Sequence, residues 1–114
     1  MIKVIVLADG SDSRRTLVLA ALRPVLVQGA RCVEVADGID ALVALRRLKP
    51  DVFIARRHLD GVDGPTLFKI ARTENGLHDV HLIGLCASAS PVNDDVNKGP
   101  HDWIRDPFDP DRLA

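Results

Sequence analysis

The sequence is poor in cysteine, has almost no net charge and contains no long apolar run. Its 114 residues carry a formal net charge of −1, which leaves no electrostatic footprint for nucleic acid or for an acidic membrane surface. No apolar run approaches the ~20 residues that a membrane-spanning helix needs. The apolar start at residues 2–7 is too short for a signal peptide. We therefore expect no nucleic acid and no membrane among the partners of this chain.

The two cysteines, Cys32 and Cys86, each lie within an apolar stretch. This placement is typical of reduced thiols in the core of a cytosolic protein rather than of a disulfide framework. A bridge between them stays open, because it depends on their distance in space. With 46% hydrophobic residues, the chain has enough apolar content to bury one core. We expect one domain over residues 1–114, located in the cytoplasm.

Short apolar runs alternate with helical patterns along the chain. Continuous β-branched and aliphatic runs are typical of strands that are buried on both faces, as in a parallel sheet. Helices are indicated between them, and we expect Pro24 to end or kink the first one. The predicted strands cover residues 4–7, 32–36, 52–55, 82–86 and 103–105, and the predicted helices follow the first three of them.

Alternating strands and helices with short connections imply a parallel sheet with right-handed crossovers. We predict the α/β class, with a flavodoxin-like, doubly wound, five-stranded parallel sheet. Residues 88–99 hold only two large apolar side chains, so we expect the fourth helix to be eroded. Asp109-Pro110 begins a helix that the chain does not complete, so the fifth helix is expected to be truncated. The apolar surface left uncovered would mark a site for a partner.

Four polar or reactive residues follow the predicted strands directly. They are Asp9, Arg56, Cys86 and Asp106. Because sites in open parallel sheets form outside the carboxyl ends of the strands, we expect these four side chains to converge. The pairs Arg14-Arg15 and Arg46-Arg47 are expected to lie on solvated faces.

Several short pieces of sequence occur in a characteristic order. With them, the chain resembles the receiver domain of two-component response regulators over residues 2 to about 112. The resemblance implies the fold predicted above, because each piece is weak alone and only their order and spacing are specific. The pieces are Asp37-Gly38 with Ala41-Leu42, Pro50-Asp51, Gly61-Val62-Asp63-Gly64, and Asp102-Trp103 followed by Pro107-Phe108.

The candidate site departs from the pattern that this resemblance implies. A working receiver has two acids after its first strand, where this chain has Ala8-Asp9. The phosphate-accepting Asp matches Arg56, so no acyl phosphate forms there. The hydroxyl residue matches Cys86, the phosphate-binding Lys matches Asp106, and the switch aromatic matches Trp103. We interpret Asp9, Arg56, Cys86 and Asp106 as a degenerate pocket with no phosphoacceptor, no metal and no cofactor.

Arg56 decides how this pocket is interpreted. Mg²⁺ requires an octahedral set of oxygens, usually including carboxylates, and a guanidinium would repel it. Arg56 has five donors in a planar fork and can serve two carboxylates at once. Our hypothesis is that Arg56 bridges Asp9 and Asp106. The alternative is that Arg56 points into solvent and binds nothing.

The resemblance and the departures together predict a pseudo-receiver, which is not an enzyme and acts by phosphorylation-independent protein–protein interaction. The expected partner is a kinase, an output domain or a second copy in a homodimer. One alternative is a phosphorelay receiver with a displaced acceptor, Asp60 or Asp9. Another is a cyclic-dinucleotide-binding regulator that uses the R-x-x-D pattern of Arg57-His58-Leu59-Asp60. The four histidines do not form a zinc pattern.

Overall fold

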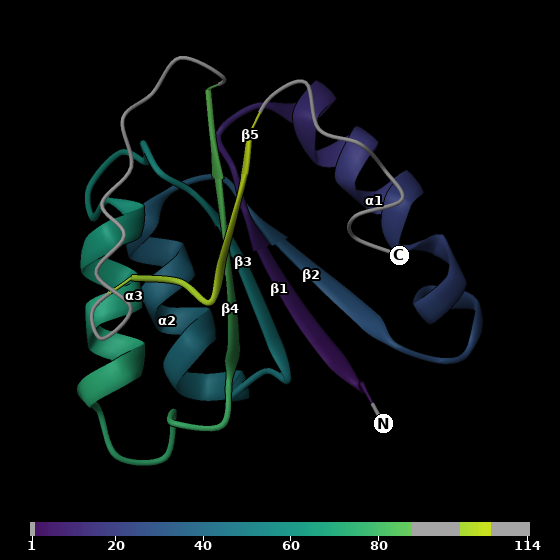
Figure 1. Ribbon diagram of the computed structural model, residues 1–114. Coiled ribbons are helices and arrows are strands. Elements are labelled where there is room, and N and C mark those ends of the chain that lie inside the picture. Colours follow the sequence, from purple (N-terminus) through teal and green to yellow (C-terminus); the bar gives the residue numbers. More distant parts are fainter. Residues whose placement is uncertain (1, 88–98, 106–114) are drawn as a thin grey trace.

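The structure is a computed structural model that describes residues 2–87 and 99–105 (Figure 1). Five parallel strands form one sheet in the order β2-β1-β3-β4-β5. This order confirms the predicted flavodoxin-like sheet. The predictions for the fourth and fifth helices fall on residues 88–98 and 106–114, outside the described residues. The strands are β1 (Val4–Ala8), β2 (Arg31–Val35), β3 (Val52–Arg56), β4 (His81–Cys86) and β5 (Asp102–Arg105).

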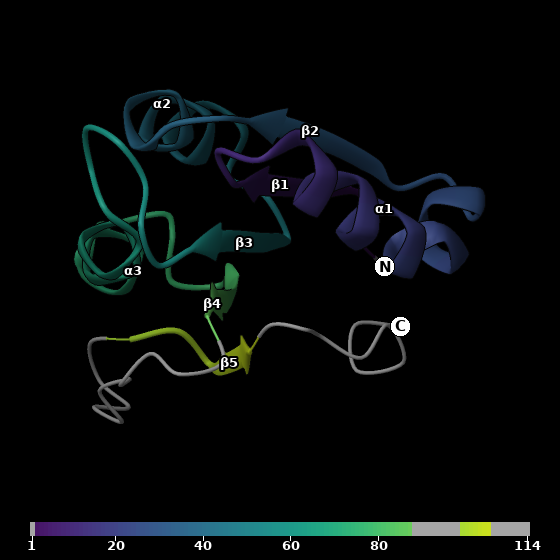
Figure 2. The same ribbon diagram turned by 90° about the horizontal axis from the view of Figure 1, so that it is seen from above.

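The described helices cover both faces of the sheet. Helix α1 (Asp12–Val27) lies on one face, and α2 (Gly38–Leu48) and α3 (Gly64–Thr73) lie on the other (Figures 1 and 2). Each begins at a side chain that accepts a hydrogen bond from a backbone N–H in the first turn, which satisfies a group the helix itself leaves unpaired. These caps are Ser11 for Arg14, Asp37 for Asp40 and Asp63 for Thr66.

Helix α1 continues through Pro24 to Val27 rather than ending at the proline. Proline lacks the N–H that would bond the carbonyl four residues earlier, which belongs to Ala20. Ala20 is exposed, so water is available to that carbonyl. Of the two expected outcomes, an end or a kink at Pro24, the end was wrong, because the carbonyl that loses its hydrogen bond lies on the exposed side of the helix.

The core consists of two apolar layers, one on each face of the sheet. Alternate residues of a strand supply opposite layers, as the period of two requires: Val6 packs toward α2 and α3, whereas Ile5 and Leu7 pack toward α1. The residues of β1 and β3 are buried in both layers apart from the partly buried Val4, and this explains why these two strands are continuous apolar runs. The largest side chains are Phe53 and Phe68, whose rings meet edge to face with centroids 6.1 Å apart.

Two backbone contacts explain pieces of the sequence pattern. The Asp51 carboxylate accepts hydrogen bonds from the N–H groups of Lys3 and Val4 at 2.7 and 3.0 Å, so it fixes the start of β1. The N–H of Gly38 donates to the Asp60 carbonyl at 2.8 Å. A Cβ at Gly38 would lie 1.7 Å from the Val62 carbonyl oxygen, so only glycine fits between α2 and the β3–α3 loop.

Within the described residues, no helix combines the length and the apolar character needed to cross a membrane.

Candidate functional site

Asp9 is the centre of the polar cluster at the carboxyl edge of the sheet. It directly follows β1, which lies between β2 and β3, so its neighbours on both sides are strands. Its N–H donates to the Val35 carbonyl at 3.1 Å, and this bond continues the β1–β2 ladder. The residue is fully buried. A buried carboxylate is costly unless it is paired and hydrogen-bonded, so its partners determine what the site does.

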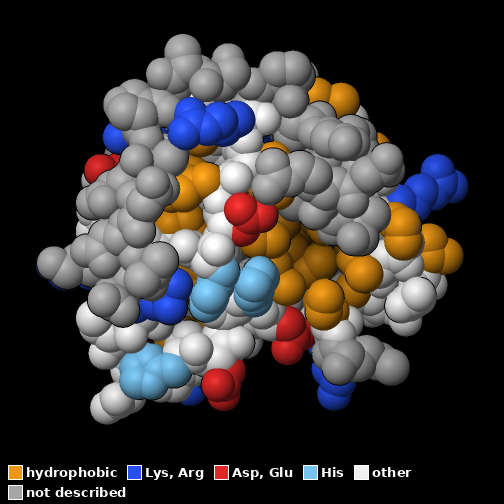
Figure 3. Space-filling model, viewed as in Figure 1, with side chains coloured by type: hydrophobic (Ala, Val, Ile, Leu, Met, Phe, Trp, Pro, Cys, Tyr) orange, Lys and Arg blue, Asp and Glu red, His pale blue; other side chains and the backbone are white. Residues whose placement is uncertain are grey.

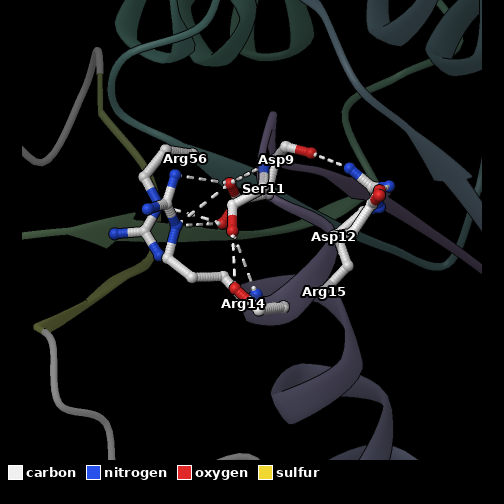
Figure 4. Close-up of polar contacts among 7 residues, drawn as sticks. Asp9, Ser11, Asp12, Arg14, Arg15 and Arg56 are labelled. Atoms are coloured by element: carbon white, nitrogen blue, oxygen red, sulfur yellow. Dashed lines mark hydrogen bonds and ion pairs between the residues drawn. The ribbon is translucent and has the colours of Figure 1, made fainter.

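Arg56, the last residue of β3, is the first of these partners. Its Nε donates to Asp9 Oδ2 at 3.0 Å, and the residue is only 5% exposed (Figure 4). The predicted Arg56–Asp9 pair is therefore present, and the alternative in which Arg56 points into solvent was wrong. Adjacent parallel strands bring their carboxyl ends to one edge, which explains the contact. The predicted contact of Arg56 with Asp106 lies outside the described residues.

Arg14, from the first turn of α1, is a second cation on the same carboxylate. Its Nε lies 3.2 Å from Asp9 Oδ1 and 3.1 Å from Oδ2, and its Nη2 lies 2.9 Å from Oδ1. The Ser11 N–H also donates to Oδ1 at 3.0 Å. Figure 4 shows the side chains of Arg14 and Arg56 directed at Asp9 from different elements. Sequence analysis missed Arg14, although an arginine five residues after the acid was a usable signal.

The expectation of a solvated face was wrong for Arg15, whereas the Arg14 side chain is 43% exposed. The Arg15 side chain is 13% exposed, and its Nε donates to Glu34 Oε1 at 3.2 Å. Its other nitrogens bond the Asp9 carbonyl and the Asp12 carboxylate. Arg15 therefore joins the start of α1 to β2 and holds the backbone of Asp9. In the other pair, Arg46 is about half exposed and contacts Glu74 at 2.9 Å.

The pKa of Asp9 reports which effect dominates in the cluster. Burial raises this pKa, whereas the hydrogen bonds from Arg14 and Ser11 and the charge of Arg56 lower it, and the net result is a pKa below its usual value. Asp9 is therefore a carboxylate at neutral pH, and the two guanidinium groups are its counter-ions.

The residues present do not fit a magnesium ion, which the receiver fold implies. A carboxylate offers about four lone-pair positions, and N–H donors of Arg14, Arg56 and Ser11 point at both oxygens of Asp9. Two guanidinium groups beside one carboxylate leave an excess of positive charge among these three side chains. Mg²⁺ would have to displace fixed cations from the carboxylate it needs. In the described ranges, no group of three or more His, Cys, Asp or Glu is placed to hold a metal.

The remaining candidate residues lie on neighbouring elements. Cys86 ends β4 at the same edge and is buried. Trp103 lies on β5 and is partly buried, and its ring packs edge to face against the Phe68 ring with centroids 5.9 Å apart. Asp60, the displaced acceptor of one alternative, lies in the β3–α3 loop and is exposed. Asp106 lies outside the described residues, so Asp9 and Arg56 are the pair that the structure shows in contact.

No family model matches the chain. Among characterised proteins it is similar to the DNA-binding response regulator MtrA of Mycobacterium tuberculosis, with 28% identity over 110 residues, covering 96% of this chain and 46% of MtrA. The Mycobacterium leprae MtrA is also 28% identical, with 96% and 47% covered. The chain thus spans about half the length of the curated relatives it matches.

Solved structures agree with this similarity. A putative response regulator from Chloroflexus aurantiacus superposes with a TM-score of 0.83 at 24% identity, covering 99% of this chain and 92% of that one. The receiver domain of the sensor histidine kinase PA1611 of Pseudomonas aeruginosa, which has a magnesium ion coordinated in its active-site cleft, superposes with a TM-score of 0.79 at 26% identity, with 99% and 92% covered.

The chain has the fold of response regulator receiver domains and is similar to them over nearly its whole length. This similarity agrees with the resemblance inferred from the sequence. Its sheet has the order β2-β1-β3-β4-β5, and the carboxyl edge of that sheet carries the Asp9–Arg14–Arg56 cluster.

Proposed function

We propose that this receiver domain is a pseudo-receiver, which takes part in two-component signalling through protein–protein contact and without phosphorylation. One observation carries the proposal: both oxygens of the buried Asp9 carboxylate accept hydrogen bonds from arginine side chains. A phosphoryl group needs an acceptor carboxylate and a divalent ion, and Arg56 stands at the acceptor position. A guanidinium is not a nucleophile at neutral pH.

The Arg14–Asp9–Arg56 cluster supplies permanently what a metal ion supplies reversibly in other receivers. Guanidinium groups stay charged at every accessible pH, so the carboxylate is neutralised from within the chain. No side chain of the cluster acts as an acid, a base or a nucleophile in this arrangement. The proposal therefore describes a binding module rather than an enzyme, acting in the cytoplasm on a protein partner such as a kinase, an output domain or a second copy.

Treatment with beryllofluoride and Mg²⁺, followed by amide NMR, tests this proposal. The Ser11 amide is the reporter, because it donates directly to Asp9. We expect no shift of the Ser11 signal and no gain of a phosphoryl group in the intact mass after incubation with acetyl phosphate. A Ser11 shift that saturates with Mg²⁺, or a phosphorylated Asp9 or Asp60, would instead establish the phosphorelay alternative.

A second test addresses the cyclic-dinucleotide alternative, in which Arg57 would bind the ligand. Isothermal titration with cyclic di-GMP should give no heat of binding if the domain acts only on proteins. Saturable heat that Arg57→Ala abolishes would assign the domain to nucleotide binding and overturn the proposal.

A further inference from the structure

At the β4–β5 edge, a histidine ring accepts a backbone hydrogen bond that a strand carbonyl would normally accept. His101 precedes β5, and its N–H donates to the Leu82 carbonyl at 2.8 Å. The Leu82 N–H donates in turn to His101 Nδ1, also at 2.8 Å. The backbone and the ring of one residue thus bind both polar groups of Leu82. Because Leu82 is buried, the ring supplies an acceptor for its amide that water does not readily supply.

The contact with Leu82 requires one protonation state of the imidazole. Nδ1 accepts a hydrogen bond only through its lone pair, so the proton of neutral His101 resides on Nε2. In the imidazolium both nitrogens carry protons, and the Leu82 N–H would then face another donor. Protonation of His101 therefore breaks the contact rather than weakening it gradually.

The charged groups around His101 oppose its protonation. From β4, the His81 ring stacks on it with centroids 4.6 Å apart and an interplanar angle of 9°. From α3, Arg72 donates through Nε to the Gly99 carbonyl at 3.1 Å and holds a fixed positive charge beside the ring. The next residue along the chain is Asp102, which begins β5. Burial and the charges of Arg72 and His81 hold the pKa of His101 below its ordinary value.

The ring of His101 lies at the surface, where solvent protons reach it. Figure 3 shows two histidine side chains side by side on this face of the molecule, in keeping with the stacked pair. Residue 101 is exposed, whereas its partner Leu82 is buried. The contact therefore joins an accessible titratable group to a buried backbone amide, and this is the arrangement that a pH-sensitive switch requires.

We infer that the His101–Leu82 contact is a pH-sensitive latch that releases the start of β5 when His101 is protonated. Among the described strands, β5 is a four-residue edge strand that pairs with β4 alone, so the loss of the ring contact leaves His101 with one of its two hydrogen bonds to Leu82. Trp103 lies two residues further on, and its position over Gly84 depends on the same pairing. Acidification therefore loosens Trp103 and alters any partner surface that includes β5.

Tautomer and exchange measurements by NMR on the full chain test the latch. At pH above about 6.5, the usual histidine value, we expect His101 in the Nε2–H form and a protected Leu82 amide. As His101 titrates, the protection factor of Leu82 should fall roughly fivefold to tenfold, the loss expected for one net hydrogen bond. A Leu82 amide whose protection is unchanged while the His101 ring titrates would overturn the inference, as would an Nδ1–H tautomer at neutral pH.

Fluorescence gives a second readout, because Trp103 is the only tryptophan in the chain. Acrylamide quenching of Trp103 should increase on acidification with the same midpoint as the His101 ring. His101→Gln should remove this midpoint, whereas His78→Gln, which alters an exposed histidine in the α3–β4 loop, should leave it in place. If the pH-dependent quenching persists in His101→Gln, the latch is not the cause and the inference fails.

Discussion

The centre and the edge of this sheet satisfy their polar groups in opposite ways. At the carboxyl end of β1 and β3, the buried Asp9 carboxylate is bound by Arg14 and Arg56, whose charge does not change near neutral pH. At the β4–β5 edge, the amide of Leu82 is bound by an imidazole, whose charge does change there. One sheet therefore combines a central ion cluster whose charges are constant near neutral pH with an edge contact that depends on the protonation of a histidine.

The two regions also differ in how much stability the protein would lose if their contacts were removed. A buried charge left without its partner is strongly unfavourable, whereas the loss of one hydrogen bond to a neutral backbone amide costs about 1 kcal/mol. The loss of a buried partner of Asp9 should therefore affect global stability, whereas the loss of the His101 ring contact should affect local order. The predictions below test this division, beginning with the largest effect.

Arg56→Ala should destabilise the fold by about 3–5 kcal/mol, because it leaves the buried Asp9 carboxylate with only the half-exposed Arg14 as its cation. Urea unfolding measures this change in the free energy of unfolding. Arg46→Ala is the matched control, since it removes an arginine from an exposed pair with Glu74 and should cost about 0–1 kcal/mol. Equal costs for the two variants would show that the buried pair contributes no more to stability than an exposed pair.

Gly84→Ala should destabilise the fold by about 1–3 kcal/mol through overpacking. A Cβ at this position would lie 2.5 Å from a carbon of the Trp103 ring, so the ring must move. We expect a shift of Trp103 fluorescence together with a lower urea concentration at the unfolding midpoint. Gly10→Ala is the control, because its Cβ would meet the Ala36 carbonyl at 3.4 Å. An unchanged Trp103 spectrum in Gly84→Ala would show that the ring does not rest on residue 84.

Arg14→Ala should cost about 1 kcal/mol, less than Arg56→Ala, because the Arg14 side chain is 43% exposed and water replaces part of its contact. The double variant with Arg56→Ala should cost more than the two single variants together, since Asp9 then loses both cations. Urea unfolding of the four proteins measures this coupling. A double variant that is simply additive would indicate that the two arginines act on Asp9 independently.

The smallest effect is a pH dependence of the centre that appears only in acid. The folded-state pKa of Asp9 lies below its usual value of 3.8, so the unfolded chain binds more protons than the folded one as the pH falls. The stabilisation by Asp9 is complete above about pH 5 and is lost as the pH falls through 3.8 toward the folded-state pKa. The difference in urea midpoint between the wild type and Asp9→Asn should therefore narrow below pH 5. A constant difference from pH 7 to pH 3 would contradict this assignment.

Much of the fold was predictable from local patterns, whereas part of the site was not. Continuous apolar runs located all five strands to within one residue or so, because both faces of the sheet are covered. The Arg56–Asp9 pair was predictable because β1 and β3 are neighbours and their carboxyl ends meet. These predictions depended on apolar runs and on the order of the elements along the chain.

Contacts that depend on side-chain length or on the backbone were not predictable in this way. Arg14 reaches Asp9 because the first turn of α1 directs it back over the strand end, and a residue pattern does not fix that direction. The ring of His101 accepts a hydrogen bond from the backbone N–H of Leu82, a group that every residue except proline has, so the sequence does not indicate this contact. The helix does not end at Pro24, because the effect of a proline depends on whether the carbonyl that loses its hydrogen bond is exposed to water.

The Arg56–Asp9 pair has a consequence for how a signal from such a domain would end. Under the proposed function, the working state needs no phosphoryl donor to begin and no phosphatase to stop, since its counter-cation is encoded in the chain. Synthesis, proteolysis and competition for the partner then become the control points. Cellular copy number, rather than covalent modification, would set the strength of the output.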